Sequence, residues 1–200
     1  SIYYPTSLVP EGSPDWRSGK WTGGGGAWLP PKQYLVDLEN MVAHGLTNPN
    51  IYQGPWRKDD GTFDYTKFEE ILALREKAGM GPGIPLYIMT HAGEPVTHSL
   101  SEKEREQAIR ETRELVAWCK ARGYPDVYIA AADEASSSRL SAERDSFQAI
   151  HDGGGKVFVA CVSDFYDLVG DLLDLPVLMA NVYDHGQSLY EQLSLTPHPA

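Results

Sequence analysis

The chain has 200 residues, of which 42% are hydrophobic, and this is enough apolar material for one domain with a substantial core. Its formal net charge of -11 is not offset by any local cluster of Lys and Arg, which excludes a phosphate backbone and so nucleic acid as a partner. No segment approaches the roughly 18 apolar residues of a bilayer-spanning helix, so no membrane partner is expected. We expect a single domain over residues 1–200. It begins at Ser1 without a signal peptide, which indicates a chain processed or excised from a longer protein.

Strands and helices alternate along the chain. The first strand is expected at 2–8, and a long loop rich in Gly, Pro and Trp follows over residues 9–31. Later strands are predicted at 50–53, 86–90, 127–132, 156–162 and 177–182. Helices are predicted at 32–44, 63–78, 101–122, 140–151 and 165–173, with a short helical stretch near 187–193.

Specific signals support two helix boundaries and the state of the two cysteines. Ser101 and Glu104 have the spacing of a capping box, in which each side chain bonds the backbone N–H of the other residue. Gly45 follows the apolar stripe of the first helix and is a suitable C-terminal cap. Cys119 lies in a helical pattern and Cys161 in a strand pattern, so buried free thiols are favoured over a disulfide or a metal site.

Six strand and helix units of this length favour parallel pairing, so the predicted fold class is α/β. An open doubly wound sheet and a (β/α) TIM-barrel-like fold both fit this alternation, because the hydrophobic pattern does not show whether the sheet closes into a barrel. We favour the barrel, since its catalytic residues follow the carboxyl ends of its strands. A full eight-unit barrel takes about 250 residues. The chain is therefore expected to form an incomplete barrel with about six units, or a shortened one.

The most informative feature is the acidic pair Asp133–Glu134, which comes directly after the apolar run 127–132. That run is typical of a buried parallel strand, and the pair therefore stands where barrels place catalytic groups. The simpler interpretation is that Asp133 caps the next helix while Glu134 lies in solvent. Because neighbouring strand residues point to opposite faces, both carboxylates face one pocket only if the backbone bends there.

Residues 34–53 resemble the second βα region of glycoside-hydrolase-like barrels related to glycoside hydrolase family 123. The likeness rests on Asp37–Leu38, on the run Ala-His-Gly-Leu-Thr-Asn-Pro at 43–49, and on Tyr52–Gln53. Asp133–Glu134 is similar to the acidic pair of those barrels, although Ala135 stands where they usually have proline. The resemblance extends over roughly residues 34–182.

This resemblance implies glycoside hydrolysis, in which an acid protonates the departing oxygen and a second group stabilises or captures the anomeric carbon. Glu134 would be the acid/base. Asp133 would orient the 2-acetamido group of an N-acetylhexosamine, which then attacks the anomeric carbon in a substrate-assisted reaction. The ordinary retaining mechanism needs a second carboxylate roughly 5 Å from the acid, usually from the seventh strand, and the chain stops before that strand. No cofactor is implied.

Other candidates for substrate binding follow the predicted strands. They are Tyr52, Gln53, Trp56, His91, Asn181 and Tyr183. Four of them have a structural alternative, which is packing on its loop for Trp56, a structural histidine for His91, and a turn at 181–184 for Asn181 and Tyr183. Ser163 and Asp164 fit an N-cap better than a site. Trp16, Trp21 and Trp28 in the first loop form either a sugar platform or lid, or packing anchors.

Two other segments resemble a metal-binding motif and a phosphate-binding loop, but each lacks residues that such a site requires. His91 to His98 lacks the HExxH spacing, and Pro95 interrupts any helix there, so no metal site is predicted. Gly23 to Gly26 lacks the Lys-Ser/Thr of a phosphate loop.

The sequence thus predicts a glycoside hydrolase with a carbohydrate substrate. The alternatives are a non-catalytic carbohydrate-binding or structural barrel fragment of a larger protein, and another α/β enzyme acting on a small polar metabolite. Open barrel edges would need a covering homodimer or neighbouring domain. The sequence does not fix the compartment, although a carbohydrate substrate favours a secreted or periplasmic protein.

Overall fold

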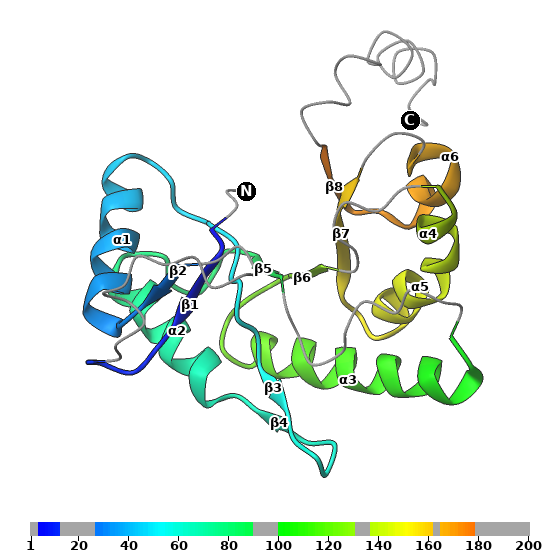
Figure 1. Cartoon of the computed structure of the whole chain (residues 1–200), viewed down its shortest axis with the longest axis horizontal. Helices are drawn as coiled ribbons and strands as arrows, with labels where there is room; N and C mark the ends of the chain where they lie inside the picture. The colour runs from blue at the N-terminus through cyan, green and yellow to red at the C-terminus, as the bar shows by residue number, and fades with distance from the viewer. Residues whose placement is uncertain (1–3, 13–26, 90–99, 131–136, 162–164, 179–200) are drawn as a thin grey trace, which may run out of the picture.

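The fold is α/β and contains a four-stranded parallel sheet, as the alternation predicts. The computed structural model describes residues 4–12, 27–89, 100–130, 137–161 and 165–178. The sheet has the order β5-β6-β7-β8, and each strand is parallel to its neighbours (Figure 1). Its strands are β5 (Leu86–Ile88), β6 (Val127–Ala130), β7 (Lys156–Cys161) and β8 (Leu175–Leu178).

A second parallel pair lies on the other side of residues 50–53. It consists of β1 (Thr6–Leu8) and β2 (Ala27–Leu29). Ile51 forms a parallel bridge with Ile88, in which the Ile51 N–H donates to the Tyr87 carbonyl at 2.6 Å. The Gln53 side chain accepts the N–H of Leu8 at 3.0 Å. Residues 50–53 therefore join β1 to β5, as Figure 1 shows, although only Ile51 there is paired as a strand residue.

The predicted helices are present, and two of them are interrupted. The described helices are α1 (Pro31–Ala43), α2 (Thr66–Lys77), α3 (Glu102–Lys120), α4 (Ser137–Ala142), α5 (Arg144–Asp152) and α6 (Phe165–Val169). The helix predicted over 140–151 is thus two helices that meet at Glu143, and the one predicted over 165–173 becomes a 3₁₀ turn, η2 (Gly170–Leu172), after α6. The helical stretch predicted near 187–193 lies outside the described residues.

Two short elements were not predicted. One is β2, which lies inside the expected first loop, so that loop is not continuous over 9–31. The other is an antiparallel hairpin of β3 (Trp56–Arg57) and β4 (Phe63–Asp64), which takes the place of the first residues of the helix predicted over 63–78. The Asp64 carboxylate accepts the backbone N–H of Thr66, so the helix begins only after that turn.

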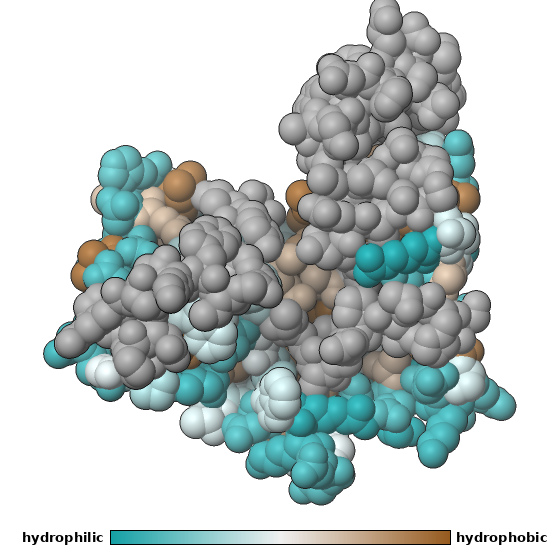
Figure 2. Space-filling view, viewed as in Figure 1, coloured by the Kyte–Doolittle hydropathy of each residue, from teal (hydrophilic) through white to brown (hydrophobic). Residues whose placement is uncertain are grey.

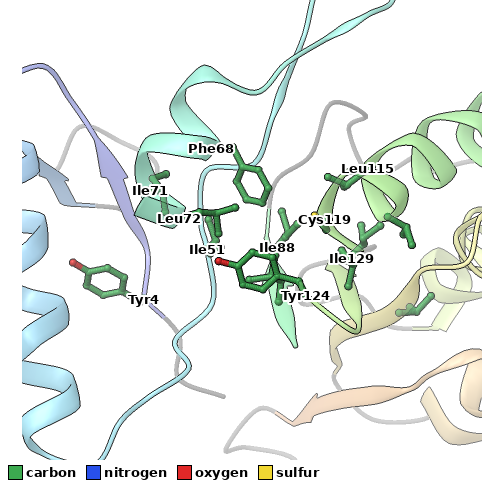
Figure 3. Close-up of a cluster of buried hydrophobic side chains, with 14 of the residues drawn as sticks. Tyr4, Ile51, Phe68, Ile71, Leu72, Ile88, Leu115, Cys119, Tyr124 and Ile129 are labelled. Carbon is green, nitrogen blue, oxygen red and sulfur yellow. The ribbon is translucent and has the colours of Figure 1, made fainter. Parts of the chain in front are cut away.

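One face of the sheet packs against helices and forms much of the core. Ile88 and Ile129 are fully buried, and Leu115 and Cys119 of α3 lie against them (Figure 3). Each such aliphatic side chain contributes about 1.5–3 kcal/mol when it leaves water. Burial also raises the pKa of the Cys119 thiol to about 12, which agrees with its prediction as a buried free thiol. The side chain of Cys161 lies outside the described residues.

The predicted capping box starts α3. The Ser101 side chain accepts the backbone N–H of Glu104, and the Glu104 carboxylate accepts the N–H of Ser101 at 2.8 Å. Ser101→Ala is expected to lower the free energy of unfolding by about 1 kcal/mol, because a donor of the first turn loses its partner. Urea denaturation measures this loss. In a double-mutant cycle with Glu104→Ala the two losses should be less than additive, and additive losses would contradict a shared cap.

Among the described helices, none combines the length and apolar content needed to cross a bilayer.

Candidate functional site

The candidate site lies where the chain leaves the carboxyl ends of the parallel strands. Because β5, β6, β7 and β8 all run in the same direction, their carboxyl ends share one edge of the sheet. Predicted site residues follow three of these ends within five positions: His91 after β5, Asp133 and Glu134 after β6, and Asn181 and Tyr183 after β8. All five lie outside the described residues, as do Ser163 and Asp164 after β7, which were interpreted as an N-cap.

Tyr52 and Gln53 are described, and they lie between β1 and β5. The Gln53 amide oxygen accepts the backbone N–H of Leu8, so this oxygen joins the segment to β1. The amide therefore has a structural role that was not predicted. Tyr52 is partly buried beside it.

Trp56 stands apart from these two residues, on the hairpin of β3 and β4. Its side chain is 76% exposed, so it does not pack against its loop. The next residue, Arg57, forms an ion pair of 3.1 Å with Glu111 of α3, which fixes the hairpin to that helix. Trp28 of β2 is also exposed, opposite Ser7 of β1.

The face of the sheet opposite α3 is aromatic. The rings of Tyr87 and Tyr128 are cross-strand partners with centroids 4.8 Å apart, and Phe158 meets Tyr87 edge-on at 6.0 Å. Both tyrosines are partly exposed, whereas the residues on either side of them along the strands are fully buried. Figure 2 shows a patch of tan, hydrophobic surface near the middle of the view.

A charged pair lies at the amino end of this aromatic face. Lys156 pairs with Asp126 at 3.2 Å, and its ammonium lies 5.2 Å from the centre of the Tyr128 ring. The hydrogen bond that Lys156 donates to Asp126 raises the pKa of Lys156, and burial raises the pKa of Tyr87. Both shifts move these pKa values further above neutral pH, where Lys156 is charged and Tyr87 is protonated.

A buried carboxyl group, that of Glu143, follows the acidic pair in the sequence. Glu143, at the junction of α4 and α5, is 0% exposed, and one of its oxygens accepts Nε–H of Arg139 at 2.9 Å. Its other oxygen, Oε2, is buried without a hydrogen-bond partner. Burial raises the pKa of Glu143, and the guanidinium of Arg139 opposes that effect.

The residues of the aromatic face and the Arg139–Glu143 pair were not predicted from the sequence. Tyr87 and Tyr128 could be found only from the register of β5 against β6. Arg139 and Glu143 have the i,i+4 spacing of a helical ion pair, which is a visible signal, but that spacing usually marks a solvated helix face.

Among the described residues no group of His, Cys, Asp and Glu could hold a metal ion. No protein-family model and no curated protein sequence matches this chain.

Proposed function

We propose that the protein is a glycoside hydrolase in which Glu134 is the acid/base and Asp133 its supporting carboxylate. One observation carries the proposal: β6, the strand that leads into the acidic pair, lies inside a parallel sheet, between β5 and β7. The carboxyl edge of such a sheet is where α/β folds bind ligands, and a central strand there has neighbours on both sides to supply further groups.

The alternation along β6 supports different roles for the two carboxylates. Val127 and Ile129 are buried on the helix side, whereas Tyr128 belongs to the aromatic face. Glu134 lies an even number of residues after Tyr128, and Asp133 lies an even number of residues after Ile129. Strand alternation would therefore assign Glu134 to the side of Tyr128 and Asp133 to the side of Ile129. In the proposal Glu134 points to the substrate, and a bend in the backbone after β6 brings Asp133 to the same side.

The proposed reaction needs no enzyme nucleophile. Glu134 gives its proton to the glycosidic oxygen as that bond breaks, and the carbonyl oxygen of the substrate's 2-acetamido group bonds to the anomeric carbon. Asp133 accepts the hydrogen bond of the acetamido N–H and stabilises its developing positive charge. Water then attacks the anomeric carbon while the Glu134 carboxylate takes one of its protons, and the bond between that carbon and the acetamido oxygen breaks. The substrate is an N-acetylhexosamine glycoside.

In the same proposal the described strands belong to an incomplete (β/α) TIM-barrel-like fold. Its sheet would run from β2 through β1 and residues 50–53 to β5, β6, β7 and β8. The outer edges of β2 and β8 would then be covered by a second copy or by a neighbouring domain.

A second candidate function is carbohydrate binding without catalysis. The exposed indole of Trp56 favours it, because a solvent-facing aromatic ring can stack on a sugar without any contribution from the acidic pair. This function predicts that glycans bind and are not cleaved.

The choice of substrate tests the proposal. The wild-type protein is expected to hydrolyse 4-nitrophenyl 2-acetamido-2-deoxyhexosides at least about 100-fold faster than the matching hexosides, because in the proposed reaction intramolecular attack by the acetamido group takes the place of an enzyme nucleophile. Release of nitrophenol measures both rates. Equal rates would show that Asp133 does not act through the 2-acetamido group. Sugar binding without turnover of any glycoside would support the second candidate function instead.

A further inference from the structure

We propose that the hairpin of β3 and β4 carries a carbohydrate-binding site of its own, in which Trp56 and Asp64 bind a sugar residue with a free, positively charged amino group. The inference takes the class of ligand, a glycan, from the proposed function. It does not depend on the position of the acidic pair, because every residue that carries it is described.

Strand pairing places Trp56 and Asp64 side by side on one face of the hairpin. They are cross-strand partners, and Arg57 and Phe63 form the neighbouring pair. Because successive residues of a strand point to opposite faces, the two pairs occupy opposite faces of the hairpin. Phe63 is buried, whereas Trp56 is 76% exposed. Trp56 and Asp64 therefore form the outer face.

The inner face fixes the hairpin to the helices. Arg57 forms its ion pair with Glu111 of α3 at 3.1 Å. The ring of Phe63 meets Tyr65 edge-on with centroids 5.8 Å apart, and Tyr65 in turn stacks on Trp118 of α3 at 4.3 Å. Figure 1 shows the hairpin beside α3. The outer face is thus held in position before a ligand arrives, so binding requires little ordering of the chain.

An indole beside a carboxylate matches an ammonium group on an apolar frame. Hydrogen bonds from the side chain and the backbone of Thr66 lower the pKa of Asp64, which is therefore ionised well below neutral pH. A carboxylate accepts several hydrogen bonds, so Asp64 can also accept those of an ammonium group. The face of the indole attracts the same cation and stacks on the C–H surface of a sugar ring.

Charge and size select the ligand. Residues 58–64 contain three aspartates and one lysine, and the whole chain has a net charge of -11, so a cationic ligand is attracted. A protein partner would need an interface of about 800 Å² on each side. Within residues 56–64, all of which are described, Trp56 is the only exposed large hydrophobic residue. One indole and one carboxylate fit a single residue of an amino sugar.

Two matched ligands test the inference with the full chain. They are the glucosamine tetramer and the N-acetylglucosamine tetramer, which differ only in the acetyl groups that remove the positive charges. The NMR signal of the Trp56 indole N–H, assigned by its loss in Trp56→Phe, reports binding at the hairpin. At a pH where its amino groups are protonated, the glucosamine tetramer is expected to bind at least about 5-fold more tightly than the acetylated tetramer.

Substitutions separate the two groups of the site. Trp56→Ala is expected to weaken binding of the glucosamine tetramer by about 10-fold or more, measured on the NMR signals of the ligand. Asp64→Asn should lower this affinity to that of the acetylated tetramer, and asparagine keeps an oxygen for the N–H of Thr66. Asp145→Asn removes the same charge from an exposed position on α5 and should keep the wild-type affinity. Circular dichroism checks that each variant folds.

Equal affinities of the two tetramers for wild type would overturn the inference, because the positive charge would then not be recognised. Equal losses in Asp64→Asn and Asp145→Asn would also overturn it, because they would show a general effect of net charge. Tetralysine tests the choice of a sugar, and binding at Trp56 as tight as that of the glucosamine tetramer would contradict it. These measurements need no hydrolysis. A protein that binds the glucosamine tetramer at Trp56 and cleaves no glycoside would therefore overturn the proposed function and leave this site standing.

Discussion

Glu134→Gln is expected to lower kcat for N-acetylhexosamine glycosides with an alkyl or sugar leaving group by about 100-fold to 10,000-fold. General acid catalysis by a positioned side chain accelerates reactions by this amount, and glutamine has the shape of glutamic acid without its transferable proton. A 2,4-dinitrophenyl leaving group departs without protonation. The first step of its glycosides should therefore lose far less rate in the variant than that of the alkyl glycosides.

The pH profile gives an independent check. Glu134 must be protonated in the free enzyme, so wild-type kcat/KM for alkyl glycosides should fall as the pH rises through the pKa of Glu134. That fall should be absent in Glu134→Gln. Glu106→Gln, which changes an exposed glutamate on α3, is the matched control and should keep wild-type rates. An equal loss on alkyl and dinitrophenyl glycosides would show that Glu134 binds substrate or supports the fold and is not the acid.

The elements that could be predicted from the sequence are those that show both a clear hydrophobic pattern and clear signals at their boundaries. The strand β6 was found because an apolar run stands between Pro125 and the acidic pair. The end of α1 was found from Gly45, which adopts a φ of +78° there. Its N–H and that of Leu46 satisfy two carbonyl groups of the last turn, a closure that needs the left-handed conformation.

The elements that were missed are too short to show a period. The hairpin strands β3 and β4 have two residues each, and tertiary packing fixes them, since Arg57 is paired with Glu111 of α3. A turn signal was available in Asp60–Gly61, where Gly61 has a φ of +83° and Asp60 binds Thr62. The apolar stripe of Phe68, Ile71 and Leu72 outweighed that signal, because these residues have the i, i+3, i+4 spacing of one helical face and are buried.

The position of the candidate site along the chain could be predicted from the sequence, but the residues that surround the site could not. Residues that follow a buried strand are visible in a sequence, so the acidic pair stood out. The stacking of Tyr87 on Tyr128 depends on strand register, which periodicity does not contain. The burial of Glu143 depends on the break between α4 and α5, where the sequence pattern indicated one continuous helix.

Arg75→Leu is expected to lower the free energy of unfolding by about 3 kcal/mol, which corresponds to a fall of about 6–12 °C in Tm. Arg75 lies near the end of α2 and is 1% exposed. Its guanidinium donates to the Pro49 carbonyl at 3.0 Å and to the Asn48 side-chain oxygen at 2.9 Å. Asn48 in turn donates to the Pro85 carbonyl, so Arg75 fixes the two loops that lead into residues 50–53 and β5.

The expected cost comes from the acceptors that remain. Leucine gains apolar burial, but it leaves the Pro49 carbonyl and the Asn48 oxygen without their charged donor in the interior. Arg75→Lys should also destabilise the protein, because an ammonium group does not reproduce the two diverging donors, and burial already lowers the pKa of this cation. Thermal denaturation measures both variants against Arg110→Leu, an exposed position where a change within about 0.5 kcal/mol is expected. An Arg75→Leu variant as stable as wild type would mean that the Pro49 and Asn48 oxygens find new donors, and that these loops do not depend on the guanidinium.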